Sequence, residues 1–137
     1  MEAFEWHVPA DRRHWTRLKL ALPKLKAIGV DMIHLPPGCK GMDPAGSGYD
    51  IYDLYDLGEF DQKGAIPTKW GTKEELEDLI CQARELGMHV LWDAVLNHKA
   101  GADFAERFKA VKVDPKRKIN IRSHFNRSVM GSCIHFL

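Results

Sequence analysis

Three polar residues stand together at the end of an apolar run, in the sequence WDAVLNH at residues 92–98. Asp93 lies inside the run, and Asn97 and His98 close it. Their side chains offer a carboxylate, an amide and an imidazole, which can act as bases, hydrogen-bonding groups or metal ligands. Because Asn97 and His98 would follow the carboxyl end of a strand, where α/β sheets and barrels place their sites, the trio predicts a pocket.

Each member of this trio also has a simpler explanation. The alternative for Asp93 is a structural acid paired with an arginine, since an unpaired carboxylate inside a covered sheet is costly. The alternative for Asn97 is a residue that caps a turn, and the alternative for His98 is an ordinary loop histidine. A metal site that joins His89 and His98 is excluded, because an extended strand would hold them roughly 30 Å apart at ~3.3 Å per residue.

A second candidate region is the long connection at residues 36–71. Aromatic side chains alternate there with carboxylates, a pairing that suits a sugar, because aromatic faces pack on its C–H face while carboxylates accept its hydroxyls. The alternative is a small satellite core beneath the connection. The aromatic residues are Tyr49, Tyr52, Tyr55, Phe60 and Trp70, and the acids are Asp50, Asp53, Asp56, Glu59 and Asp61.

The elements around these residues predict an α/β fold. Residues 73–86 form a helix with a Thr72–Glu75 capping box and a stop at Gly87, and residues 88–96 follow as a strand buried on both faces. Upstream, the pattern predicts a strand at 3–8, a helix at 15–28 that Pro23 kinks or restarts, and a strand at 30–37. This order implies parallel pairing of the strands.

The composition of the chain indicates which partners and which cellular compartment to expect. The chain after residue 111 contains six Lys/Arg and one acid, whereas the chain before it contains fourteen Lys/Arg and eighteen acids. The basic residues show no regular spacing, so nucleic acid is not expected as a partner. The three cysteines are scattered and show no C-x-x-C spacing, which favours reduced thiols. Neither a secretory signal nor a membrane-spanning run is present, so we expect a cytoplasmic chain. Motifs for phosphate binding and for a serine nucleophile are also absent.

Several segments together resemble the α-amylase family of glycoside hydrolases. DAVLNH at 93–98 is similar to the first signature block of this family, and GYDIYDLYDLGEFDQKG at 48–64 to the loop after its second barrel strand. FEWHVP, HW, LKAIGVD, LPPGCKG, TKWGTKEEL and NHKAGAD resemble the liquefying and fungal intracellular type, so that the likeness covers roughly residues 1–118. It implies about three βα units of a (β/α)8 TIM barrel and an α-1,4-glucan as substrate.

The resemblance also implies roles for individual residues. Tyr49 would stack under the sugar at the cleavage subsite, and His98 would hydrogen-bond that sugar. Trp6 would be an aromatic of an outer subsite. Asp93 would orient an arginine beside the nucleophile, and Asn97 would be a ligand of a structural calcium ion.

The three catalytic acids of this family come from barrel strands four, five and seven, and no residue here matches their sequence blocks. We therefore expect no catalytic residue in this chain, no activity from these 137 residues alone, and poor solubility from an unpaired sheet edge. The predicted units are a barrel portion at 1–98, the start of an inserted calcium-binding domain at 99–118 and a divergent, disordered tail at 119–137. Such an end would fit a truncated or misread gene product.

Two other functions remain open. One is a glycan-binding module without chemistry, which would use Tyr49, Trp6 and His98. The other is a small flavodoxin-like regulatory domain, which would need a phosphate or acceptor-aspartate site at the strand ends and which the long connection at 36–71 disfavours.

Overall fold

In a computed structural model, the residues described are 1–104, 106–113, 120–129 and 134–135. The chain divides into two compact units. The first unit holds Met1–Gly101 and strand β8 (Ile134–His135), and the second unit is built on strands β6 (Glu106–Val113) and β7 (Asn120–Val129).

Helix α2 (Lys73–Glu85) confirms the predicted capping box. The Thr72 hydroxyl accepts the backbone N–H of Glu75 at 3.3 Å, and the Glu75 carboxylate accepts that of Thr72 at 3.0 Å, so two N–H groups at the helix start are satisfied. The chain leaves the helix through Gly87, whose φ of +65° lies in the left-handed region that glycine adopts easily. The buried face consists of Leu76, Leu79 and Ala83.

Helix α1 (His14–Ala27) runs through Pro23 as one element, so that of the predicted kink or restart at this proline the restart does not occur. Pro23 cannot donate a hydrogen bond to the turn before it, but it lies on the exposed side of the helix, where water can serve the carbonyl that loses its donor. Trp15, Leu18 and Leu22 form the buried stripe.

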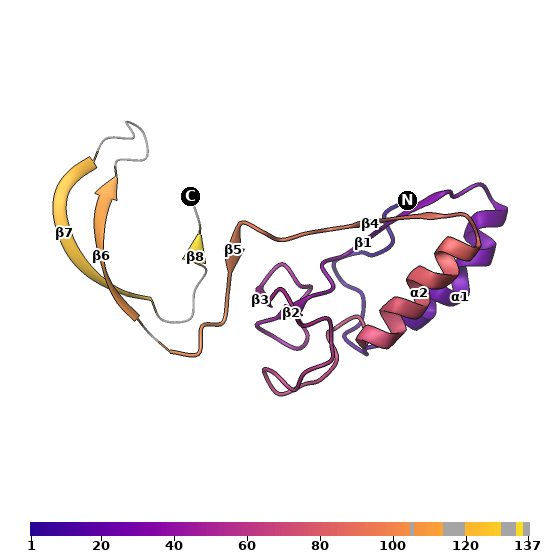
Figure 1. Cartoon of the computed structure of the whole chain (residues 1–137), viewed down its shortest axis with the longest axis horizontal. Coiled ribbons are helices and arrows are strands. Elements are labelled where there is room, and N and C mark those ends of the chain that lie inside the picture. The colour runs from indigo at the N-terminus through magenta and orange to yellow at the C-terminus, as the bar shows by residue number, and fades with distance from the viewer. Residues whose placement is uncertain (105, 114–119, 130–133, 136–137) are drawn as a thin grey trace. The chain divides into compact units, whose positions relative to one another are not determined.

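Strands β1 (Met32–Leu35) and β4 (His89–Trp92) pair in parallel, from Met32 with His89 to Leu35 with Trp92, which confirms the predicted parallel order. Figure 1 shows α1 and α2 side by side along these two strands. Apolar side chains from both helices and from β1 pack together in one core. Its most buried members are Trp15, Leu22, Ile33, Leu35, Trp70, Leu76, Leu79 and Ala83.

The predicted buried strand at 88–96 is wrong in both extent and burial. Regular pairing ends at Trp92, and Leu91 and Leu96 are 48% and 73% exposed. In the described part of the chain β4 pairs only with β1, and the helices cover one face of this pair, so an apolar sequence suited to two covered faces keeps one of them open. Asp93 is consequently half-buried rather than enclosed in a sheet.

The predicted strand at 3–8 is also wrong. It is reduced to one parallel bridge between Glu2 and His34, with the Ala3 N–H donated to the His34 carbonyl at 2.9 Å. A turn follows at Trp6 and His7, where the Glu5 carboxylate accepts the N–H of His7 at 2.8 Å. This turn takes the backbone away from β1, so the alternation of apolar and polar residues does not extend into a ladder.

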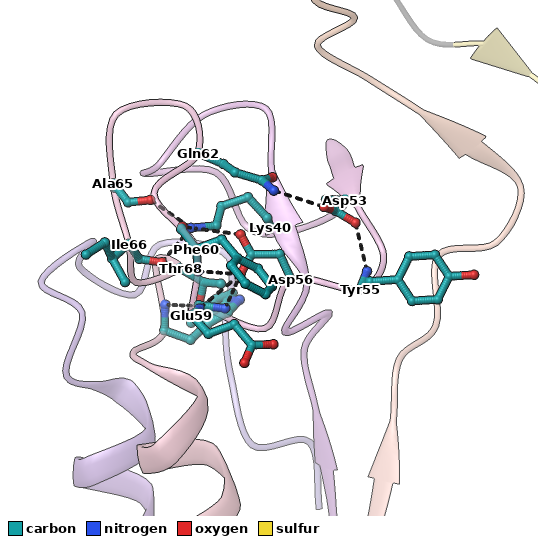
Figure 2. A network of polar contacts seen from close by, with 12 residues as sticks. Lys40, Asp53, Tyr55, Asp56, Glu59, Phe60, Gln62, Ala65, Ile66 and Thr68 are labelled. Carbon is teal, nitrogen blue, oxygen red and sulfur yellow. Dashed lines mark hydrogen bonds and ion pairs between the residues drawn. The ribbon is translucent and has the colours of Figure 1, made fainter.

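The long connection at 36–71 is ordered around a short antiparallel pair, β2 (Lys40–Gly41) and β3 (Ile51–Asp53). Beneath it, the ammonium of Lys40 and the carboxylate of Asp56 are fully buried and 3.3 Å apart. Lys40 Nζ also donates to the backbone carbonyls of Phe60, Ala65 and Ile66, as Figure 2 shows. One lysine thus binds three carbonyls from two stretches of a connection that has little regular structure of its own.

Asp56 completes this network from the other side. One of its carboxylate oxygens accepts the backbone N–H groups of Gly58, Glu59 and Phe60 at 2.8, 3.0 and 3.4 Å (Figure 2). Both charges therefore have several hydrogen-bond partners, which is the condition for burying an ion pair. The alternative of a satellite core of aromatic side chains is wrong, because Tyr55 and Phe60 are exposed, and a polar network lies beneath the connection instead.

The remaining strands lie toward the C-terminal part of the chain. Strand β5 (His98–Lys99) pairs antiparallel with β8, and β6 pairs antiparallel with β7. β7 falls within the segment 119–137 predicted to be disordered, and the predicted unit boundaries at residues 98 and 118 stay predictions. In the part of the chain that the structure describes, no helix is long and apolar enough to cross a membrane.

Candidate functional site

Tyr49 joins the residues that the sequence singles out. Its phenol hydroxyl donates a hydrogen bond to the Asp93 carboxylate, and its backbone carbonyl accepts one from His98 Nε2 at 2.7 Å. Its ring lies nearly parallel to that of Trp6, with 5.5 Å between centroids and 18° between planes. Four predicted site residues, separated by up to 92 positions in the sequence, thus form one contiguous cluster, which we call the Tyr49 cluster.

Local backbone geometry brings Tyr49 to this position. Gly48 has a φ of +89°, and a Cβ built on it would lie 2.3 Å from the Pro37 carbonyl oxygen, so only glycine fits here without displacing the backbone. Asp50, on the other side of Tyr49, accepts the N–H of Asp43 at 2.9 Å and closes the turn before β3. The Ile51 carbonyl then accepts the N–H of Ala100 at 2.7 Å, which ties this segment to the chain just after His98.

Asp93 reaches the cluster from the end of β4. Its N–H donates to the Leu35 carbonyl at 3.3 Å, which carries the ladder one residue beyond Trp92, and its side chain then meets the Tyr49 hydroxyl. A neutral phenol is therefore the partner that the structure gives this carboxylate. The arginine implied by the resemblance is not among the partners of Asp93 in the described residues.

The contact with Asp93 changes the acidity of Tyr49. Burial and the hydrogen bond to the Asp93 carboxylate raise the pKa of Tyr49 to about 12. Both causes act against a second negative charge beside the carboxylate, so the phenol stays protonated near neutral pH and keeps its role as a donor.

His98 uses one ring nitrogen inside the cluster. Since a carbonyl only accepts, Nε2 carries the proton in its contact with Tyr49, which fixes the ring beside the Tyr49 backbone. The hydrogen bond from His98 to a sugar stays a prediction.

Asn97, the predicted calcium ligand, has an exposed side chain. Calcium binds about six to eight oxygen ligands, and no group of three or more His, Cys, Asp or Glu residues that could hold a metal exists in the described part of the chain. The role of Asn97 as a calcium ligand stays a prediction.

Trp6 is 60% exposed, although its ring is stacked on Tyr49. The sequence analysis missed the residue that contacts its backbone: Lys69 Nζ donates to the Trp6 carbonyl at 3.4 Å. The only sequence signal for this contact is a lysine directly before Trp70 in the motif TKWG, and it does not point to a residue 63 positions away.

With this geometry established, the comparison with known proteins decides the family. The family described as "Alpha amylase, catalytic domain" matches residues 18–125. The chain belongs to this family. It is 43% identical to an alpha-amylase of Bacillus licheniformis over 136 residues, and 41% identical to the cytoplasmic alpha-amylase of Escherichia coli (strain K12) over 122 residues.

These alpha-amylase matches cover 99% and 88% of this chain but only 27% and 25% of the two relatives, so the chain spans about a quarter of the length of the curated relatives that it matches. The match to the Bacillus licheniformis protein also runs past residue 118, so the limit set there from motifs alone is too early.

A solved structure supports the fold class. An alternansucrase in complex with isomaltononaose aligns with 88% of this chain and 11% of its own, with a TM-score of 0.67 and 21% identity. The two-strand, two-helix core around β1 and β4 is therefore part of the (β/α)8 barrel of alpha-amylase-type proteins, as predicted.

Proposed function

We propose that this chain forms one wall of the substrate cleft in a glycoside hydrolase of the alpha-amylase type, which cleaves α-1,4-glucosidic bonds of starch-like or glycogen-like polysaccharides with retention. The observation that carries the proposal is the Tyr49 cluster, in which Trp6, Tyr49, Asp93 and His98 meet at the end of β4. Family membership supplies the reaction class, and the cluster supplies a surface with the chemistry that a glucan needs.

The cluster combines two kinds of contact. The rings of Trp6 and Tyr49 offer flat apolar faces to the C–H groups of a glucose unit, and the Asp93 carboxylate offers acceptor oxygens to hydroxyl groups. The Tyr49–Asp93 hydrogen bond holds ring and carboxylate at fixed positions, so that little side-chain freedom is left to lose when a sugar binds. His98 supports the same tyrosine from its backbone side.

The chemistry itself requires acids that we assign to residues outside these 137. A retaining glycosidase needs a nucleophile and a general acid about 5 to 5.5 Å apart. Asp93 is committed to Tyr49, and the resemblance gives it a supporting role, so it is not proposed as either acid. The 137-residue polypeptide alone is expected to bind a glucan weakly and to hydrolyse none.

The proposal is tested by maltoheptaose binding, measured by calorimetry on the 137-residue chain. We expect Tyr49→Ala to abolish binding, because it removes both the ring face and the partner of Asp93. Tyr55→Ala is the matched control, since Tyr55 is 86% exposed and its ring points away from the neighbouring polar network in Figure 2. Equal loss in both variants, or unchanged binding in Tyr49→Ala, would contradict the proposal.

A second measurement separates this function from that of a glycan-binding module without chemistry. Starch hydrolysis is followed by loss of iodine staining, first with the 137-residue chain and then with a polypeptide that carries the acids of the family beyond residue 137. Activity only in the longer polypeptide supports a hydrolase. Binding without hydrolysis in both would favour the binding module, and clearing by the short chain would refute the assignment of the acids.

Calcium and location complete the proposal. Asn97 would contribute a single oxygen ligand to a calcium site whose other ligands lie outside the described residues. A cytoplasmic location is proposed from the sequence and from the likeness to the cytoplasmic alpha-amylase of Escherichia coli.

A further inference from the structure

The segment that carries Trp6 has little regular structure to hold it in place. Its only described ladder contact is the bridge between Glu2 and His34, and the chain then turns at Trp6 and His7. An exposed indole on such a segment would sample many positions, and restricting it costs conformational entropy. The stacking of Trp6 on Tyr49 therefore needs further contacts that fix the backbone.

Two side chains from other parts of the fold supply these contacts. His14, at the start of α1, donates from Nε2 to the Ala3 carbonyl at 2.9 Å. Lys69, just before α2, donates from Nζ to the Trp6 carbonyl at 3.4 Å. The first contact holds the segment near its bridge to β1, and the second holds the residue whose ring belongs to the Tyr49 cluster.

Lys69 is unusual for a lysine, because it is only 7% exposed and no carboxylate partner exists for it in the described part of the chain. Its ammonium lies 4.9 Å from the centroid of the Trp70 ring and otherwise meets the Trp6 carbonyl. A buried cation is costly unless nearby groups offset the lost hydration. The face of an aromatic ring and a carbonyl dipole are such groups.

Trp70, whose ring lies against the Lys69 ammonium, is held firmly in the core. Trp70 is almost fully buried, its indole N–H donates to the Pro37 carbonyl at 3.0 Å, and its own carbonyl accepts the N–H of Trp15 at 3.0 Å. The His14 ring packs against it at 5.1 Å between centroids, and burial lowers the pKa of His14, which keeps a second positive charge away from Lys69. Lys69 thus links Trp70, which is fixed in the core, to the backbone at Trp6, which has little regular structure to hold it.

We propose that Lys69 is a positioning residue for glucan binding: its ammonium fixes the Trp6 carbonyl so that the indole is stacked on Tyr49 before a sugar arrives. The inference rests on the proposed function of the Tyr49 cluster and adds a residue that acts through Trp6 without touching the glucan. A preformed surface of this kind improves affinity by reducing the entropy lost on binding.

The first test is a double-mutant cycle on maltoheptaose affinity. We expect Lys69→Met to weaken binding about tenfold, which is the order expected for losing a hydrogen bond from a charged donor. Lys69→Arg, which keeps a cation, should recover most of the affinity. In the Trp6→Ala background, Lys69→Met should have almost no further effect, because its target is gone. Lys19→Met, which removes a partly exposed lysine paired with Asp78, is the control and should bind as the parent does.

Equal loss from Lys69→Met with and without Trp6 would overturn the proposal, because it would show that Lys69 acts independently of the indole. If Lys69→Met fails to fold, Lys69→Gln takes its place in the cycle, since it retains an N–H donor but no charge. The expected result for Lys69→Gln is a smaller loss of the same non-additive kind.

The second test needs no ligand and reads the position of the segment directly. Hydrogen exchange is measured on peptides from residues 1–8 and from α2. Lys69→Met should speed exchange in the first peptide by about tenfold and leave the second unchanged. Unchanged exchange at 1–8 would overturn the proposal. If the parent chain binds no maltoheptaose, the proposed function fails, and this exchange measurement still decides the role of Lys69.

Discussion

The replacement Lys40→Met is the sharpest test of how the long connection is held. It removes an ammonium that is fully buried beside the Asp56 carboxylate and bound to the carbonyls of Phe60, Ala65 and Ile66. Methionine has a similar length and leaves little empty volume, so that the effect reports the lost charge and hydrogen bonds. What stays behind is a buried carboxylate without its cation.

The expected magnitude follows from the partners that remain. Removing one member of a buried ion pair costs about 3 to 5 kcal/mol, because the other charge is left uncompensated. Asp56 keeps the backbone N–H groups of Gly58, Glu59 and Phe60, which continue to stabilise one of its oxygens. We therefore expect the lower end of the range, about 3 kcal/mol. Adding Asp56→Asn should recover about 2 kcal/mol, because it removes the stranded charge.

Native-state hydrogen exchange at the Gly58 and Glu59 amides measures this loss as the free energy of opening the connection. Lys73→Met is the matched control: its ammonium pairs with the Glu59 carboxylate at 2.7 Å, but both side chains are partly exposed, so less than about 1 kcal/mol should be lost. A loss in Lys40→Met no larger than in this control would show that the Lys40–Asp56 pair does not hold the connection. A double variant with Asp56→Asn no more stable than Lys40→Met would refute the reasoning about the stranded charge.

Three further predictions concern the site and its supports. Gly48→Ala should disrupt the Tyr49 cluster and abolish maltoheptaose binding, whereas Gly64→Ala, with a similar positive φ but nothing within 4 Å of its new Cβ, should lose only about 1 to 2 kcal/mol of stability and keep binding. Tyr49 should titrate with a pKa of about 12 in an absorbance titration, and Asp93→Asn should lower that pKa. Since the raised pKa means that the native state holds its proton longer, this contribution to stability is complete below about pH 10 and lost as the pH rises toward 12; stability rising over that window would contradict it. Thr72→Ala should cost about 1 kcal/mol in thermal unfolding through the lost cap, and an unchanged melting temperature would contradict the cap assignment.

Local signals predicted the helices well because their causes lie within a few residues. The Thr72–Glu75 capping box and Gly87 fix both ends of α2 without help from distant parts of the chain. Strand burial has no such local cause. An apolar run such as MHVLWDAVL indicates that both faces of a strand are suited to burial, but it does not show which elements cover them. Leu91 and Leu96 are exposed because the neighbours that would cover them are not among the described residues.

The sequence predicted which residues belong to the site but not which partners they contact. Motif resemblance pointed to Trp6, Tyr49, Asp93 and His98, and the structure places all four in contact with one another through Tyr49. Their partners were not predictable, because a hydrogen bond such as that from Tyr49 to Asp93 joins residues 44 positions apart. The buried charge of Lys40 was also missed, since a lysine in a loop reads as exposed until its carbonyl partners are known.

The open face of β4 bears on how such a chain is made. During synthesis the N-terminal elements leave the ribosome first, and domains begin to organise before later residues exist. α1, α2, β1 and β4 already share one core, whereas the outer edge and one face of β4 remain open in the described residues. For a nascent polypeptide this edge is a template for the next strand, and until that strand arrives it is the surface that a chaperone would have to shield from neighbouring chains.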